Sequence, residues 1–109
     1  MNYNIIPSTN FKKEAKILIK KYPSLKNDLI LFEKNIEKEL LLAVDLGGGF
    51  KKIRINITSK GKGKSGGARL VTHETIISIE DKNIVLGSIY DKSEYETIDT
   101  KILKEILGL

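Results

Sequence analysis

The stretch of sequence that decides the fold is KKIRINITSKGKGKSGGARLVTHETIISI, from Lys51 to Ile79. Near its start, Ile53, Ile55 and Ile57 alternate with basic or polar residues, which predicts a half-buried strand with a basic outer face. Its last part, from Arg69 to Ile79, is rich in β-branched residues and contains no glycine or proline. That composition predicts a long strand in the centre of a sheet.

The segment SKGKGKSGG, from Ser59 to Gly67, joins these two strands and is called the Lys/Gly loop below. It lies in a block of positive charge, since no Asp or Glu occurs between Asp45 and Glu74, whereas the whole chain carries a formal net charge of +5. Such a block repels itself and indicates an anionic partner, of which phosphate, and hence nucleic acid, is the commonest. The block holds seven basic residues: Lys51, Lys52, Arg54, Lys60, Lys62, Lys64 and Arg69.

The N-terminal part of the chain predicts one strand and two helices. Tyr3–Pro7 is a short β-type run that we expect either to end at Pro7 or to lie at an edge of the sheet, because proline cannot donate to a sheet ladder. A helix capped by Ser8 or Thr9 then runs to Pro23, and a second helix has its apolar stripe over Leu25–Leu40. Two helices separated by a single proline turn predict a helical hairpin that covers a sheet.

The C-terminal part predicts two further elements after the long strand. Asp81-Lys82-Asn83 is expected to be a turn, Ile84–Tyr90 a strand, and the apolar stripe of Ile98–Leu107 a final helix. With LGGGF (46–50) as a break, the predicted order is β-α-α-β-β-β-α. We therefore expect one α+β domain over residues 1–109, with a small antiparallel sheet, the helical hairpin on one face and the basic side chains on the other.

The composition also excludes several classes of protein. The chain has no cysteine, which rules out disulfides and thiolate metal sites, and its single histidine argues against structural zinc. We expect no metal and no cofactor. The N-terminus has no signal-peptide pattern, and the longest apolar run, Leu40–Val44, is too short to span a bilayer, so a cytoplasmic protein is expected. The GKS triplet is not a P-loop, because Thr58 stands where the first glycine is required and a strand follows Ser65.

The helical hairpin, the strand FKKIRI, the loop KGKGKSGGARLV and the later segment IYDKSEYETI together resemble the RelE/ParE toxin superfamily. The resemblance covers nearly the whole chain and is closest to the HigB-like branch of type II toxin–antitoxin toxins. It implies a RelE-like fold and a ribosome-dependent mRNA endonuclease (an mRNA interferase) that inhibits translation. It also implies three partners: the ribosome, mRNA and a cognate antitoxin, which we expect to be a helix-turn-helix protein.

Metal-independent RNA cleavage requires a base, an acid and positive charge near the reacting phosphate. Arg54 and Arg69 are the only two arginines in the chain, and arginine offers phosphate a rigid bidentate fork. The resemblance implies catalytic roles for Lys52, Arg54 and Arg69, with Lys92 near a later basic position. It also implies that Tyr95 stacks on a substrate base. Unlike RelE, the chain has an acidic residue, Glu94, soon after Lys92.

The sequence leaves the base open. A lysine is a poor base at neutral pH unless neighbouring cations lower its pKa. The competing base and acid are His73 and Glu74, and His73 shares strand parity with Arg69, although a lone strand histidine can also be structural. We expect five residues to bind RNA or the ribosome, with a solvated hairpin tip as the alternative for the loop lysines: Lys51, Lys60, Lys62, Lys64 and Tyr95.

Two other functions compete with the nuclease. One is a ParE-like toxin that binds and inhibits DNA gyrase, and the other is a nucleic-acid-binding protein with no toxin role. The clustering of Lys52, Arg54 and Arg69 favours the nuclease, because toxins of the ParE type tend to lack such a cluster.

Overall fold

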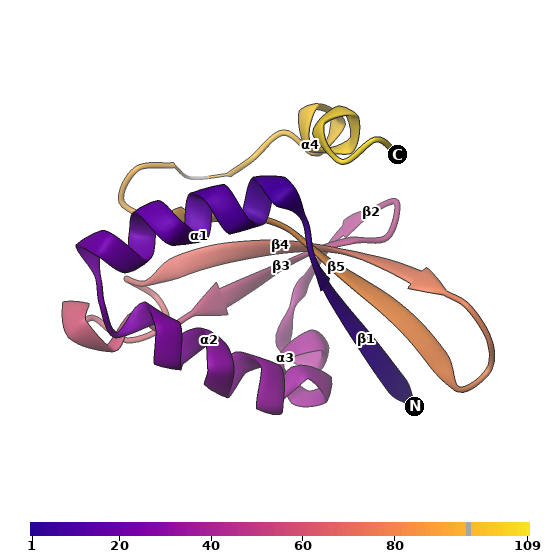
Figure 1. Ribbon diagram of the computed structural model, residues 1–109, viewed down its shortest axis with the longest axis horizontal. Helices are drawn as coiled ribbons and strands as arrows, with labels where there is room; N and C mark the ends of the chain where they lie inside the picture. The colour runs from indigo at the N-terminus through magenta and orange to yellow at the C-terminus, as the bar shows by residue number, and fades with distance from the viewer. Residues whose placement is uncertain (96) are drawn as a thin grey trace.

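The computed structural model describes residues 1–95 and 97–109 and is an α+β fold built on one sheet (Figure 1). In this described part the sheet has five strands and the chain has four α-helices, none of them long and apolar enough to cross a membrane. The predicted order β-α-α-β-β-β-α is wrong in detail, because one helix is divided and one strand is added. The elements are β1 (Asn2–Pro7), α1 (Thr9–Lys21), α2 (Leu25–Lys34), α3 (Ile36–Leu42), β2 (Val44–Gly47), β3 (Phe50–Ile55), a 3₁₀ turn η1 (Thr58–Lys60), β4 (Ala68–Ile76), β5 (Asp81–Asp91) and α4 (Thr100–Ile106).

Asn35 divides the predicted second helix into α2 and α3. Its backbone leaves the helical region (φ −111°, ψ 25°), and its side-chain amide donates to the carbonyl of Leu31 at 2.9 Å. An asparagine side chain that bonds to the backbone in this way competes with the helical ladder. The break lets α3 turn away from α2, and Figure 1 shows α3 nearly end-on where α2 runs across the view.

The added strand, β2, forms a hairpin with β3 through the segment LGGGF. Gly47, Gly48 and Gly49 have φ values of 84°, 62° and 86°, which glycine adopts without a steric penalty. The sequence predicted only a break at this point, whereas Gly47 is the last residue of β2 and Gly48 and Gly49 make the turn between two paired strands. As a result, β2 is an edge strand that lies beside β3.

The sheet is mixed, with the strand order β1-β5-β4-β3-β2. β1 pairs parallel with β5, and every other neighbouring pair is antiparallel, so the expected antiparallel sheet is wrong at one edge. The reason is that β1 and β5 are joined by most of the chain, so no hairpin dictates their relative direction. The central position predicted for the long strand is confirmed, because β4 lies in the middle of the sheet.

The turn between β4 and β5 lies at residues 77–80 and not at 81–83 as predicted. The hydroxyl group of Ser78 donates to the carboxylate of Asp81 at 3.0 Å and accepts from the amides of Glu80 and Asp81. These bonds close the chain on itself just before Asp81. Residues 81–83 are therefore free to pair with β1 as the start of β5.

Each face of the sheet has its own apolar cluster. The helices α1, α2 and α3 cover one face, to which Phe11, Leu25 and Ile36 contribute. On the other face Leu103 of α4 packs in a smaller cluster with Tyr90 and two further residues of the sheet. Figure 1 shows the strands passing between α2 and α3 on one side and α4 on the other. The second face is thus only partly free, because α4 covers part of it.

Side chains at the start of α1 complete the backbone bonding of β5 beyond the end of β1. The hydroxyl of Ser8 donates to the carbonyl of Gly87 at 3.1 Å. The carboxylate of Glu14 accepts from the hydroxyl of Ser88 at 2.7 Å and from the amide of Ile89 at 3.3 Å. Because buried backbone groups require partners, these bonds hold the last residues of β5 against α1.

Candidate functional site

A basic cavity of about 660 Å³ lies where α3, β2, β3 and the Lys/Gly loop meet. Four of the five residues expected to be catalytic line it, together with Lys64 of the loop. The structure thus gathers five cations from three separate segments of the chain around one opening. The lining residues are Glu39, Leu42, Val44, Lys52, Ile53, Arg54, Lys64, Arg69 and Lys92.

Two of the lining residues form a pair of like charges. Arg54 of β3 and Arg69 of β4 are cross-strand partners in the antiparallel ladder. Burial first, and the charge of Arg54 second, lower the pKa of Arg69 below its usual value, with an opposing effect from Tyr90. Within the described residues, no carboxylate forms an ion pair with either arginine. Like charges in this position destabilise a sheet, so the pair is suited to an anion that is supplied from outside.

Arg69 also holds the Lys/Gly loop in place. Its guanidinium group donates to the carbonyls of Lys64 at 3.0 Å, Ser65 at 3.0 Å and Ala68 at 3.1 Å. The side chain is only 5% exposed. Arg69 therefore acts as the anchor of the loop at the rim of the cavity, and its remaining positive charge contributes to the potential there.

Helix α2 holds the start of the loop from the other side. The carboxylate of Asp28 accepts from the amide of Thr58 at 2.9 Å, and the hydroxyl groups of Ser24 and Ser59 lie 2.9 Å apart. The loop is consequently fixed at its start by α2 and at its end by Arg69. Both ends of the loop are thus held by hydrogen bonds, unlike those of a free hairpin tip.

Lys60 forms a largely buried ion pair and does not stand free on the loop as the sequence suggested. Its ammonium group lies 2.8 Å from the carboxylate of Asp91, and the two side chains are 10% and 0% exposed. Burial alone would raise the pKa of Asp91, but hydrogen bonds from Lys60, Ser93 and Tyr22 outweigh it and hold the pKa well below its usual range. This pair fastens the loop to the end of β5.

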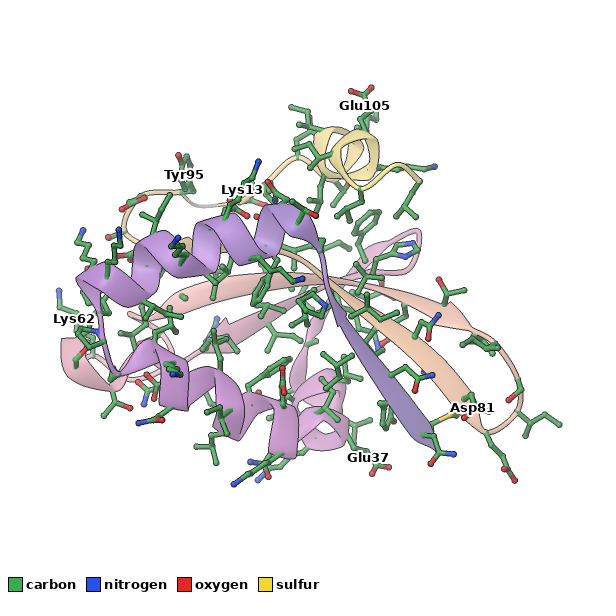
Figure 2. The ribbon with its side chains drawn as sticks, in the orientation of Figure 1. Lys13, Glu37, Lys62, Asp81, Tyr95 and Glu105 are labelled. Atoms are coloured by element: carbon green, nitrogen blue, oxygen red, sulfur yellow. The ribbon has the colours of Figure 1, made fainter. Side chains whose placement is uncertain are left out.

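The other two loop lysines are exposed and differ in their contacts. Lys62 lies at the opposite end of the molecule from Asp81 and projects from the loop (Figure 2). Lys64 directs its ammonium group to Glu39 of α3, with 3.1 Å between Nζ and Oε1. Of the three loop lysines, Lys62 is thus the one available to an external phosphate without breaking a contact found in the structure.

His73 and Glu74 are not part of the basic cavity. The ring of His73 packs against that of Phe50, with 4.8 Å between centroids, at the far end of β3 from Arg54. Glu74 is the next residue on the strand and so points to the opposite face, where Lys51 and Lys82 bind it at 2.9 and 3.3 Å. His73 and Glu74 therefore cannot act together as base and acid, and Lys51 lies away from the cavity.

Lys92 and Tyr95 are only three residues apart but lie at different surfaces. Lys92 lines the basic cavity, and its amide donates to the carbonyl of Gly67 at 3.1 Å, at the end of the loop. Tyr95 lines a separate cavity of about 220 Å³ beside α1 and is 59% exposed. Its ring meets that of Tyr90 edge to face, with 5.8 Å between centroids. A base stacked on Tyr95 would therefore lie outside the basic cavity.

Sequence reasoning missed Glu39, which is the one carboxylate among the described residues that line the basic cavity. The sequence analysis gave Glu39 no role, because no local motif connects it to Lys64, which lies 25 positions later. The only available signal was its position beside the apolar residues at the end of the helical stripe. The break at Asn35 redirects α3 and brings Glu39 to the loop.

No model of a known protein family matches this chain. Among residues 1–95 and 97–109, no three His, Asp or Glu side chains are grouped closely enough to hold a metal ion. The interpretation of the site therefore depends on the geometry of the cavity itself. Among the described residues that line it, five cations around one carboxylate make a surface that can bind a phosphate backbone and stabilise additional negative charge on it.

Proposed function

We propose that this protein is the toxin of a type II toxin–antitoxin system and acts in the cytoplasm as a ribosome-dependent mRNA endonuclease. The observation that carries the proposal is the uncompensated pair of Arg54 and Arg69, with Lys52, Lys64 and Lys92 around the same cavity. A fold that needed charge only for solubility would place these cations apart, because side-by-side cations repel each other.

The proposed reaction uses this charge directly. A 2′-hydroxyl group attacks the adjacent phosphorus, and negative charge grows on the phosphate oxygens in the transition state. Arg54 is exposed and can bind two of these oxygens with its fork, while buried Arg69 adds charge without leaving the loop. Lys52 and Lys92, at the sides of the cavity, would bind the flanking phosphates. No metal or other cofactor is needed for these steps.

The proposal includes the partners of the protein. Outside the cavity, exposed Lys62 extends the positive surface and would contact ribosomal RNA, which accounts for dependence on the ribosome. A cognate antitoxin, which we expect to be a helix-turn-helix protein encoded next to this chain, would keep the toxin inactive. A ParE-like gyrase inhibitor remains the competing function, and it would not use the charge pair for chemistry.

Induced expression followed by primer extension on a translated mRNA tests the proposal. We expect growth arrest and new cuts in the message only when ribosomes translate it, and no arrest from the Arg54→Ala variant at equal protein level. Cutting of naked RNA at the same rate would contradict ribosome dependence. Arrest with intact mRNA and broken DNA would instead support the gyrase function.

A further inference from the structure

Glu39 occupies an unusual place for an acidic residue. It lies on α3 with its side chain 14% exposed, and its carboxylate accepts hydrogen bonds from Lys64 at 3.1 and 3.4 Å. It also lines the smaller cavity next to the basic one, in both cases together with Arg54 and Lys64. A carboxylate placed only to neutralise these cations would be expected on the arginine pair, yet neither arginine bonds to it.

The proposed cleavage needs a group that removes the proton of the 2′-hydroxyl. A general base must accept a proton, which a carboxylate is chemically suited to do and an ammonium or guanidinium group is not. The base and acid that the sequence offered as the alternative to a lysine, His73 and Glu74, lie outside the cavity. Glu39 is the described lining residue that combines the right chemistry with the right place.

We infer that Glu39 is the general base of the reaction, an assignment that rests on the proposed function. The carboxylate takes the proton from the 2′-hydroxyl, and the 2′-oxygen forms a bond to phosphorus as the bond from phosphorus to the 5′-oxygen breaks. The departing 5′-oxygen takes a proton from a lysine ammonium of the cavity. The products are a 2′,3′-cyclic phosphate and a 5′-hydroxyl end. Arrival of the substrate phosphate gives Lys64 a second anion to bind, which frees the carboxylate for this step.

The isosteric variant Glu39→Gln tests the assignment, with Glu37→Gln as the matched control. Glu37 lies on the same helix and is exposed (Figure 2). Its replacement by Gln removes the same charge as Glu39→Gln does. We expect Glu39→Gln to slow ribosome-dependent cleavage by about 10²- to 10⁴-fold, the usual effect of removing a general base. Ribosome binding should be unchanged or tighter, because Glu39 is the one carboxylate among the described residues that line the basic cavity, and its negative charge is gone. The melting temperature should hardly change, since the pair with Lys64 is partly exposed.

A second variant, Glu39→Asp, should regain part of the activity because it keeps the carboxylate on a shorter side chain. Cleavage by Glu39→Gln at the wild-type rate would overturn the inference and leave the proposed function intact. Parallel losses of binding, melting temperature and cleavage in Glu39→Gln would also overturn it, because they would assign Glu39 a role in packing. If the wild-type protein leaves translated mRNA intact, the proposed function fails, and the inference fails with it.

Discussion

Arg54 and Arg69 lie directly opposite each other on neighbouring strands, yet Arg54 is exposed to solvent whereas Arg69 is buried, with 5% of its surface accessible. The buried Arg69 donates to two carbonyls of the Lys/Gly loop and to the carbonyl of Ala68, whereas the exposed Arg54 remains open to the cavity. The pair thus divides two tasks between chemically identical groups. Arg69 positions the loop, and Arg54 presents its fork to a ligand.

This division predicts different effects for the two alanine variants. Arg54→Ala should lose about a hundred- to a thousand-fold in cleavage rate, the usual effect of removing one charge that stabilises a transition state. Its melting temperature should stay the same or rise slightly, since a repulsion between like charges is relieved. Primer extension beside thermal unfolding measures both quantities. A stable Arg54→Ala protein that cleaves normally would contradict this role.

Arg69→Ala should instead lose activity together with stability, because three carbonyls lose a charged donor. Arg69→Lys should restore only part of both, since one ammonium group cannot reproduce the geometry of the guanidinium fork. Limited proteolysis of the loop checks the cause: the alanine variant should be cut within residues 59–67 faster than the wild type. Equal protease resistance would mean that Arg69 does not hold the loop.

Two of the loop lysines should have different roles, since we expect Lys62 to bind RNA and Lys60 to stabilise the fold. Lys62→Ala should weaken ribosome binding and reduce the slope of log K against log salt by about 0.7 to 0.9, the value of one phosphate contact. It should not alter stability. Lys60→Ala should lower the melting temperature, because Asp91 is left buried without its cation. If both variants changed only binding, the buried pair would not be needed for the fold.

Asp91 predicts a pH dependence of stability. Its pKa is lower in the folded protein than the value of about 3.9 for a free aspartate, so the carboxylate favours folding when it is ionised. This stabilisation is fully present above the unfolded pKa and is lost as the pH falls through the lower folded pKa. Asp91→Asn should therefore be less stable by about 3 kcal/mol near pH 7.

The difference between Asp91→Asn and the wild type should shrink as the pH is lowered below about 3.9. Thermal or urea unfolding from pH 2 to pH 7 measures this trend. Glu94→Gln serves as the control, since its pair with Lys21 is exposed and long, at 3.9 Å. A constant difference between Asp91→Asn and the wild type at every pH would show that ionisation of Asp91 does not stabilise the fold.

Gly67 is predicted to be the glycine of the loop that tolerates substitution least. A Cβ atom there would collide with the backbone carbonyl of Ile55, whereas a Cβ at Gly61 would meet open space. Gly67→Ala should destabilise the protein by about 3 kcal/mol or more, as severe overpacking does. Gly61→Ala should cost about 1 kcal/mol from its positive φ alone. Urea unfolding compares them, and equal losses would exclude the backbone contact as the cause.

Local pattern predicted those parts of the fold that local interactions determine. Ser8 caps α1 through the amide of Phe11, and the alternation of Ile53 and Ile55 correctly placed both residues in the core. The division at Asn35 was missed because a single side-chain bond to the backbone competes with a continuous apolar stripe. The direction of β1 was missed because its partner lies at the other end of the chain.

The residues of the candidate site likewise fall into those that local pattern could place and those that it could not. Lys52, Arg54 and Arg69 come together because strand parity and one antiparallel ladder suffice to place them. Lys60 could not be recognised as buried from its glycine-rich surroundings, because its partner Asp91 is 31 positions away. Glu39 could not be identified for a similar reason, because Lys64, with which it pairs, lies 25 positions later. A basic pattern in sequence therefore indicates where cations are, but not which of them are already engaged.

The parallel pairing of β1 with β5 has a consequence for the protein while it is being synthesised. The first strand leaves the ribosome early, but its partner follows almost at the end, since Asn2 and Asp81 are 79 positions apart. Pairings of such long range form late, because closing the intervening chain costs entropy. Asp91, which fastens the loop, and Lys92, which lines the cavity, are also added late. A nascent chain therefore carries no complete cavity before Lys92 has been added, and on the proposed function the ribosome that makes the toxin is spared until its own message has been read past Lys92.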